Sequence, residues 1–321
     1  MVNKTCFFGL LHIKKNENAL LNFKSTNDNH KILVYLKNAI LLDQQLKNYG
    51  YNFILLTNNS RYLKKLLKNL KYNLELKQLH FRTFVPHNTH FYACHFRVDV
   101  FKYLSSLKKN YSILLDLDVL ILKNPNKIFK YIKNNINLVN DITDNVIPAY
   151  GVEKIKKNLK ILNINSKNIK WYGGDWFSGN SLFFKTLYKK TNFFQKKFVK
   201  NKKLLSDQTD ELFMSAAINE IKQQNLHKLK NIRSTGIFTR YWNTNVKHFQ
   251  KKILYYQSFH ILHVPADKIF LSDCFQNLDR KKNFKDDYFN HIKSLKNLVK
   301  KNILHMIPNK LKIIIKKYLI L

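Results

Sequence analysis

Two aspartates inside an apolar segment are the residues of this sequence best suited to chemistry. The segment from Tyr111 to Pro125 reads YSILLDLDVLILKNP, and no basic residue accompanies Asp116 and Asp118 before Lys123. Residues two apart on a strand point to the same face, so the two carboxylates would lie together. In an apolar setting they would raise each other's pKa unless a cation joined them. The pattern therefore predicts a magnesium or manganese site, with phosphate oxygens completing the metal's ligands.

The stretch WYGGDWFSGN, residues 171–180, is the most unusual part of the chain by composition. It contains three of the seven glycines and two of the three tryptophans. Glycines let a backbone approach a ligand closely, and indole faces pack against sugar rings, which makes Gly173, Gly174 and Trp176 candidate sugar-binding residues. Asp175 could bind sugar hydroxyls. The alternative is a glycine-shaped turn with both tryptophans in the core.

The spacing of apolar residues predicts strands and helices that alternate around these residues. A helix before each strand is typical of an α/β domain with a mostly parallel sheet. We expect strands at residues 5–12, 52–57, 74–81 and 112–122, and helices at 32–50, 61–70 and 91–110. Residues 181–230 are expected to be largely helical, and a short strand and turn follow at 259–271.

The organisation that we expect is one large domain and a tail. Residues 1–285 would form the α/β domain, with a first half at about 1–130 and a second at about 131–285. Residues 286–321 would form the tail, which from Phe289 onward contains eight lysines and no acid. Its apolar residues recur at helical spacing, and a basic amphipathic helix suits the surface of an anionic bilayer. The alternative is a helix docked on the domain with a solvated lysine face.

Charge and composition limit the kinds of partner. The chain has 57 Lys and Arg against 20 Asp and Glu, a net charge of +37, and only six of the basic residues are arginine. This excess indicates an anionic membrane surface, nucleic acid or a phosphate-bearing substrate. Base readout favours the arginine fork, so sequence-specific nucleic-acid binding is disfavoured. The first residues read as a strand, no membrane span is evident and the three cysteines are scattered, which together predict a cytoplasmic protein.

The segment DLDVLILKNP and the preceding HFRVDVFKYL resemble metal-dependent glycosyltransferases of the GT-A fold, most of all the retaining family 8. Arg97 and Asp99 match the helix that precedes the family's DxD strand. GGDWFSGNSLFF resembles the segment that lines the sugar sites, although WYGGDWFSG is also similar to family 6. SDQTDEL resembles the segment near the anomeric carbon, here Asp207 and Gln208, for which a helix N-terminus is the alternative reading.

The last matching element is ILHVPADKIF, which resembles the late histidine and lysine of that family. The resemblance implies that His263 joins Asp116 and Asp118 at the metal, and that Lys268 meets the diphosphate together with Arg97. His260 is a rival ligand, but strand alternation separates it from His263. Asp207, Gln208 and Asp175 remain alternatives for the residue at the anomeric carbon.

The function that the resemblance implies is transfer of a hexose from a nucleotide-sugar, with UDP favoured, to a glycan or lipid-linked acceptor. The basic tail adds a peripheral position at the inner face of the membrane and a role in lipopolysaccharide or other surface polysaccharide synthesis. Two alternatives stay open. One is a haloacid-dehalogenase-type phosphatase with Asp116 as nucleophile, although Leu120 stands where Thr or Val is usual. The other is a non-catalytic basic protein that binds membrane or nucleic acid.

Overall fold

The computed structural model describes residues 5–13, 28–87, 89, 91–107, 111–165, 168–242, 247–275 and 284–306. The chain divides into two compact units, Met1–Asp279 and Arg280–Leu321. The strands are β1 Thr5–Leu11, β2 Asn52–Thr57, β3 Leu76–Gln78, β4 Tyr111–Leu115, β5 Val119–Ile121, β6 Asn137–Asp141, β7 Tyr172–Asn180, β8 Leu229–Asn231, β9 Phe238–Arg240 and β10 Ile261–His263.

The helices lie between these strands for most of the first unit. They are α1 Asp28–Lys47, α2 Ser60–Asn69, α3 Arg97–Ser106, α4 Ile128–Lys133, α5 Thr143–Tyr150, α6 Val152–Ile161, α7 Ser181–Asn201, α8 Asp210–Gln223, α9 Ile253–Tyr256, α10 Lys268–Cys274 and α11 Phe284–Met306. Short 3-10 helices are η1 Tyr92–Phe96, η2 Lys202–Leu204 and η3 Ile232–Thr235.

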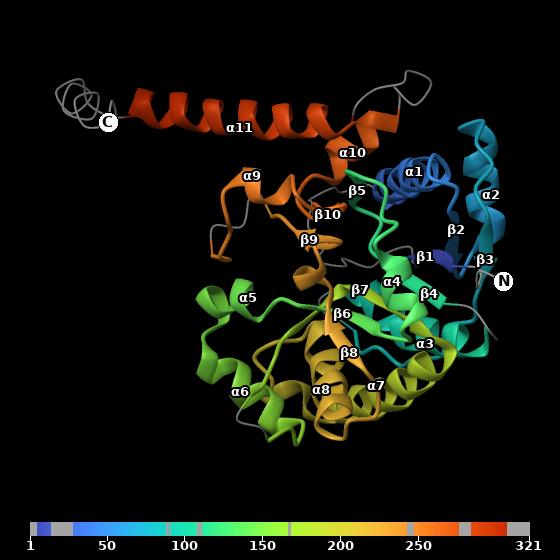
Figure 1. The fold of residues 1–321 in the computed structure, drawn as a ribbon, viewed down its shortest axis with the longest axis vertical. Helices are drawn as coiled ribbons and strands as arrows, with labels where there is room; N and C mark the ends of the chain where they lie inside the picture. The colour runs from blue at the N-terminus through green and yellow to red at the C-terminus, as the bar shows by residue number, and fades with distance from the viewer. Residues whose placement is uncertain are drawn as a thin grey trace. The chain divides into compact units, whose positions relative to one another are not determined.

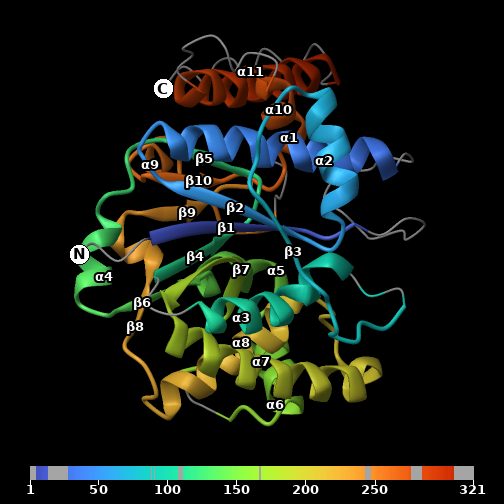
Figure 2. The ribbon, with the colours of Figure 1, turned by 90° about the vertical axis from the view of Figure 1, so that its right-hand side faces the viewer.

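A seven-stranded sheet forms the centre of the first unit (Figure 1). Among the described residues its order is β3-β2-β1-β4-β7-β6-β8. The pairs β1–β2, β1–β4, β2–β3 and β6–β8 are parallel, whereas β7 runs antiparallel to both β4 and β6. Figure 2 shows α1 on one side of the sheet and α3, α7 and α8 on the other. The prediction of an α/β fold with a mostly parallel sheet is confirmed.

The expected strand at residues 112–122 is in fact two strands in two sheets. β4 ends at Leu115, and β5 begins at Val119 and belongs to a three-stranded sheet of order β5-β10-β9. Both strands are fully buried, which is why the segment read as one continuous apolar run. Asp116, Leu117 and Asp118 form the connection, so the two aspartates lie at the joint between the sheets and not within a strand.

The glycine-rich stretch forms a strand, β7, which lies in the large sheet between β4 and β6. Eight of its nine residues are buried. The turn that was one alternative reading is therefore wrong, although its placement of the tryptophans in the core is right: Trp171 and Trp176 have no exposed surface. Small residues replace the usual β-branched ones here, because neighbouring side chains approach this strand closely.

The second unit contains helix α11, Phe284–Met306. This confirms a helix over the first part of the predicted tail. The second amphipathic segment, after Pro308, lies outside the described residues. Among the helices of the described residues, none is both long enough and apolar enough to cross a bilayer.

Candidate active site

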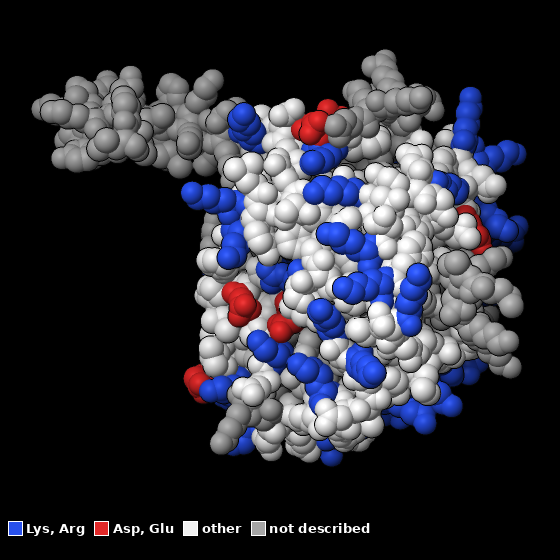
Figure 3. All heavy atoms as spheres, viewed as in Figure 1, with Lys and Arg blue, Asp and Glu red and all other residues white. Residues whose placement is uncertain are grey.

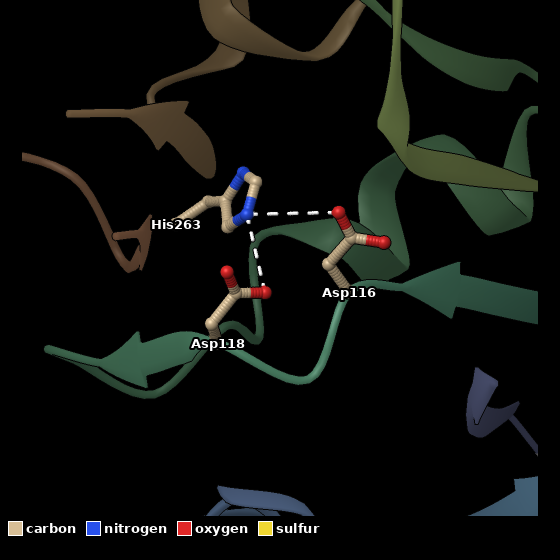
Figure 4. A group of neighbouring side chains, drawn as sticks. All are labelled: Asp116, Asp118 and His263. Atoms are coloured by element: carbon tan, nitrogen blue, oxygen red, sulfur yellow. Dashed lines mark ion pairs between the residues drawn. The ribbon is translucent and has the colours of Figure 1, made fainter. Parts of the chain in front are cut away.

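The two aspartates and one histidine meet where the large sheet passes into the small one (Figure 4). β10 runs antiparallel to β5 with His263 opposite Val119, which brings the imidazole to the connection that carries the aspartates. Nε2 of His263 lies 3.6 Å from Oδ2 of Asp116 and 3.3 Å from Oδ1 of Asp118. The fold thus brings together the three residues that the resemblance implied as metal ligands.

These three residues fit a divalent metal ion. One ligand atom from each lies within 4.8 Å of the other two. Nε2 of His263 is buried, makes no well-aligned hydrogen bond among the described residues and faces the carboxylate oxygens of Asp116 and Asp118. Two carboxylate oxygens and one imidazole nitrogen are donors suited to manganese or magnesium.

The electrostatics of this cluster also favour a cation. Burial disfavours a charged His263, but Asp118 and Asp175 outweigh burial and raise its pKa to about 9. Burial likewise disfavours an ionised Asp118, but Lys268 and His263 outweigh it and hold the pKa of this carboxyl well below its ordinary value. The Asp118 carboxylate thus stays ionised, and positive charge beside it is favourable.

Each aspartate directs its other oxygen to a basic side chain. Oδ1 of Asp116 accepts a hydrogen bond from Nη2 of Arg97, and Oδ2 of Asp118 accepts one from Nζ of Lys268. Lys268 is 4% exposed and also donates to the carbonyl of Pro265 at 2.6 Å. The two cations that the resemblance assigned to the diphosphate therefore lie directly beside the candidate metal ligands.

Asp175 lies behind the imidazole and fixes its orientation. It is fully buried, and its Oδ2 accepts from Nδ1 of His263 at 2.8 Å and from Nε of Arg240 at 2.7 Å. Its Oδ1 accepts from Asn140 at 2.8 Å. Burial opposes its charge, but Arg240 and His263 hold the pKa of Asp175 well below the ordinary value. An ionised carboxylate only accepts, so Nδ1 carries a proton and Nε2 faces Asp116 and Asp118. Because the pKa of His263 is raised, Nε2 is also protonated at neutral pH without a metal, and a bound metal ion would replace that proton.

His260 does not compete for this position. Its Nδ1 contacts the backbone carbonyl of Asn124 instead of the aspartates. The sequence prediction that only one of the two histidines reaches the aspartates agrees with this placement.

Gly173 and Gly174 are required by close packing around these charged groups. A Cβ at Gly173 would lie 2.5 Å from Oδ1 of Asp175, and one at Gly174 would lie 2.7 Å from Nη1 of Arg97. Real Cβ atoms do not approach neighbours so closely, so any side chain here would displace the network. Their role in the structure is to let the ion pairs form against the backbone of β7.

The segment SDQTDEL forms the entrance to α8, as its alternative reading predicted. Oδ1 of Asp207 accepts from the backbone N–H and the hydroxyl of Thr209, at 2.8 and 2.7 Å. Gln208 makes a long contact, 3.5 Å, with the carbonyl of Lys202. Thr209 contributes to the lining of the nearby pocket, whereas Asp207 and Gln208 do not.

The next two acids of this segment face the cluster instead. Oδ2 of Asp210 accepts from Nη1 of Arg97. Oε1 of Glu211 accepts from Nη2 of Arg240 at 2.8 Å, and its Oε2 from Nε1 of Trp171 at 3.1 Å. Burial and Glu211 raise the pKa of Asp210 to about 6, although Arg97 opposes this. Arg97 thus links Asp116 to the first turn of α8, and Arg240 links Asp175 of β7 to the same turn.

A pocket of about 230 Å³ opens above this network. The candidate metal ligands, Arg97 and Lys268 all line it. Other lining residues include Leu10, Leu11, His12, Asp28, Lys31, Ile32, Tyr35, Phe91, Tyr92, Ala93, Cys94, Tyr150, Gly174, Glu211, Arg240, Trp242 and His248. A pocket with aromatic walls and a few convergent charged groups is typical of a small-molecule site.

Two further predicted site residues, Asp99 and Trp176, also lie outside the pocket wall. Oδ2 of Asp99 accepts from the backbone N–H groups of Arg82 and Thr83, at 3.1 and 2.9 Å, and thereby holds the loop after β3. Trp176 packs against Phe238 in the core, and its Nε1 donates to Ser178 at 3.1 Å. Neither residue is part of the pocket wall.

Asp210, Glu211 and Arg240 were not predicted from the sequence. The two acids come three or four residues after Asp207, one helical turn further along, which is a signal that could have been used. Arg240 is one of only six arginines, but nothing near it in the sequence indicates a partner. Its position follows from β9 pairing with β10, where it lies opposite His263.

Comparisons with known proteins identify the fold and no more. The chain matches no protein-family model, and a search of curated proteins finds no similar sequence. Among solved structures, the galactosyltransferase LgtC in complex with donor and acceptor sugar analogs is 11% identical, with a TM-score of 0.51 over 83% of this chain and 95% of that one. The structure of an active-site mutant of LgtC is also 11% identical, with a TM-score of 0.51 over 85% of this chain and 94% of that one.

A third structure, mouse xyloside xylosyltransferase 1 in its apo form, is also 11% identical. Its TM-score is 0.45 over 80% of this chain and 96% of that one. The two LgtC structures match most of both chains at a TM-score of 0.51, which shows a shared fold. The chain therefore has the GT-A fold.

Proposed function

We propose that the protein is a metal-dependent glycosyltransferase that moves a hexose from a nucleoside-diphosphate sugar to a glycan or a lipid-linked acceptor. The observation that carries this proposal is the group of Asp116, Asp118 and His263, whose ligand atoms converge in a pocket that Lys268 and Arg97 also line. In a GT-A fold, this combination of anionic and cationic groups suits a metal-bound diphosphate.

The charged groups would have two roles at the leaving group, metal binding and phosphate binding. Asp116, Asp118 and His263 would hold manganese or magnesium, which when bound stabilises the negative charge that develops on the departing diphosphate. Lys268 would bind phosphate oxygen as a point charge and Arg97 as a planar fork. Both basic side chains are held beside the candidate metal ligands, and each would exchange part of its present hydrogen bonds for phosphate oxygens.

The pocket lining suggests where the two substrates bind. One group of lining residues comes from the carboxyl end of β1, the start of α1 and the segment at 91–94. Ligands of α/β sheets bind at the carboxyl ends of strands, so we assign the nucleoside to this group. A second group comes from α5, α8 and the residues after β9, and includes Tyr150, Trp242 and His248. We assign the acceptor to these aromatic residues.

Glu211 is our candidate for contact with the transferred sugar. Asp207, Gln208 and Asp175, the earlier alternatives for the anomeric carbon, do not line the pocket, whereas Glu211 does and its side chain is 16% exposed. Arg240 and Trp171 hold its carboxylate in place. A carboxylate fixed in this way is suited to accepting hydrogen bonds from sugar hydroxyls.

The acceptor would be lipid-linked, as in lipopolysaccharide or other surface polysaccharide synthesis, and the protein peripheral at the inner face of the membrane. Support comes from the basic sequence of 289–321, of which residues up to 306 are helical. UDP-sugars are the first donors to test, because the resemblance to family 8 favours them.

A thermal-shift panel tests the donor site. UDP-, GDP- and CMP-sugars would each be added with manganese and with a chelator to the wild type, to Asp118→Ala and to the control Asp99→Ala. Asp99 is an aspartate of the neighbouring helix that does not line the pocket. We expect metal-dependent stabilisation by one nucleotide in the wild type and the control, and its loss in Asp118→Ala.

Absence of stabilisation by any nucleotide in the folded wild type would refute the proposal. The phosphatase alternative predicts a different result: hydrolysis of p-nitrophenyl phosphate that Asp116→Asn abolishes, with no nucleotide-sugar binding. If the protein is a basic binding protein without catalytic activity, we expect neither stabilisation by a nucleotide-sugar nor hydrolysis of p-nitrophenyl phosphate.

A further inference from the structure

An exposed segment beside the pocket, residues 247–256, combines basic and apolar side chains. Leu254 is 69% exposed, Phe249 50% and Tyr255 37%. Three exposed lysines lie among them: Lys247, Lys251 and Lys252. We propose that this segment, here called the basic-apolar patch, binds the surface of an anionic lipid bilayer.

The patch is held firmly on the first unit. The backbone of Phe249 donates to the carbonyl of Asn145 at 3.0 Å, and the Asn145 side chain donates back to the Phe249 carbonyl at 2.8 Å. The side chain of Gln250 makes a similar pair of bonds with the backbone of Trp242. Because these bonds fix the backbone, the exposed position of the side chains is part of the fold and does not arise from a loose loop.

The charge of the patch is uniformly positive. The sequence contains no Asp or Glu from Trp242 to Ala266. Lys251 lies over the ring of Tyr255, 5.6 Å from its centroid. Figure 3 shows lysine and arginine side chains over the region where Figure 1 places α9, and few acids near them. Such a surface attracts anionic lipid headgroups within a Debye length.

The apolar side chains decide between a bilayer and another anionic partner. Leu254 and Phe249 would gain nothing from the phosphates of a nucleic acid, whereas both can enter the boundary between headgroups and acyl chains. Lysines around them can keep their charged ends in the headgroup layer while their stems cover apolar surface. Basic residues interleaved with large apolar ones are typical of a membrane interface and not of a protein surface that faces water alone.

The position of the patch connects it with the site. His248, one residue before Phe249, lines the pocket, as does Trp242, which Gln250 holds. A bilayer bound at the patch would therefore lie next to the part of the pocket that we assign to the acceptor, which rests on the proposed function. This contact is separate from the one proposed for 289–321, since it involves residues of the first unit.

Tryptophan fluorescence with brominated lipids can locate the contact in the full-length protein. Leu254→Trp places a reporter on the patch, and Leu204→Trp is the matched control, because Leu204 is 67% exposed on η2. Of the three native tryptophans, Trp171 and Trp176 are fully buried, whereas Trp242 lies beside the patch and is only partly buried. Both reporters are therefore introduced together with Trp242→Phe, so that the remaining tryptophans contribute a constant background. With brominated vesicles that contain phosphatidylglycerol, we expect strong quenching at position 254 and little at 204. Vesicles of phosphatidylcholine alone should quench neither.

Vesicle sedimentation gives a second, independent measurement. Leu254→Ser should weaken partitioning by about tenfold, the loss expected from one leucine side chain that leaves an apolar phase. Lys251→Gln should weaken it by about fivefold, and more so at low salt. Leu204→Ser should leave partitioning unchanged.

Three results would overturn the proposal: no binding to anionic vesicles, binding without quenching at position 254, or equal quenching at 254 and 204. Binding without quenching at 254 would assign the membrane contact to the tail. None of these measurements involves a nucleotide-sugar, so failure of the patch and failure of the proposed glycosyl transfer remain distinguishable.

Discussion

The substitution Asp175→Asn tests whether a buried carboxylate orients His263 for a metal ion. Asp175 is fully buried and accepts three hydrogen bonds, two of them from Arg240 and His263. An asparagine keeps one acceptor oxygen but turns an N–H₂ group toward donors and removes the charge that favours proton retention on Nδ1 of His263. Loss of a carboxylate that hydrogen-bonds a metal-binding histidine typically lowers metal affinity by roughly 10- to 100-fold.

The same change carries a stability cost. Breaking a buried ion pair and leaving a donor unsatisfied costs roughly 3 kcal/mol, which corresponds to a Tm lower by roughly 6–12 °C for a domain of this size. Isothermal titration with manganese would be performed below the lowered Tm, so that unfolding does not contribute to the lost affinity.

Glu211→Gln is the matched control for this experiment. Glu211 is the other carboxylate partner of Arg240, at 2.8 Å, but the structure shows no hydrogen bond between it and His263. The substitution Glu211→Gln should therefore lower the free energy of unfolding but leave the manganese affinity within about twofold of the wild-type value. If Asp175→Asn bound manganese as tightly as the wild type, or if both variants lost affinity equally, the assignment of an orienting role to Asp175 would be refuted.

Three further predictions concern packing and ionisation. Gly174→Ala should lower the free energy of unfolding by roughly 1–3 kcal/mol in urea, since its Cβ would press on Arg97 and Asp210; an unchanged midpoint would contradict this. Trp176→Phe should lower Tm but leave donor binding unchanged in the thermal-shift panel, because the indole lies in the core. Weakened donor binding would show that Trp176 contributes to the site. Burial raises the pKa of Asp210 from 3.8 to about 6, so the folded protein retains a proton that the unfolded chain releases. The stability from this proton is complete below about pH 4 and is lost as pH rises through about 6, and Asp210→Asn should flatten urea stability over that interval.

The sequence alone determined the fold class and the identity of the three candidate metal ligands. Strands and helices alternate clearly in the first 130 residues, because the period of apolar residues changes from two to 3.6 between them. Asp116 and Asp118 stood out because carboxylates are rare in an apolar run. His263 and Lys268 were named through a family resemblance, and the structure brings both to the aspartates.

Only the tertiary structure decided which neighbouring residues share the pocket with them. Local pattern could not show that residues 112–122 divide between two sheets, since both strands are buried on all sides. It could not show that Arg97 connects Asp116 with Asp210, or that Arg240 connects Asp175 with Glu211. These partners lie 19 to 113 positions apart along the chain. Ion pairs of this kind depend on strand order and register, which the period of a sequence does not specify.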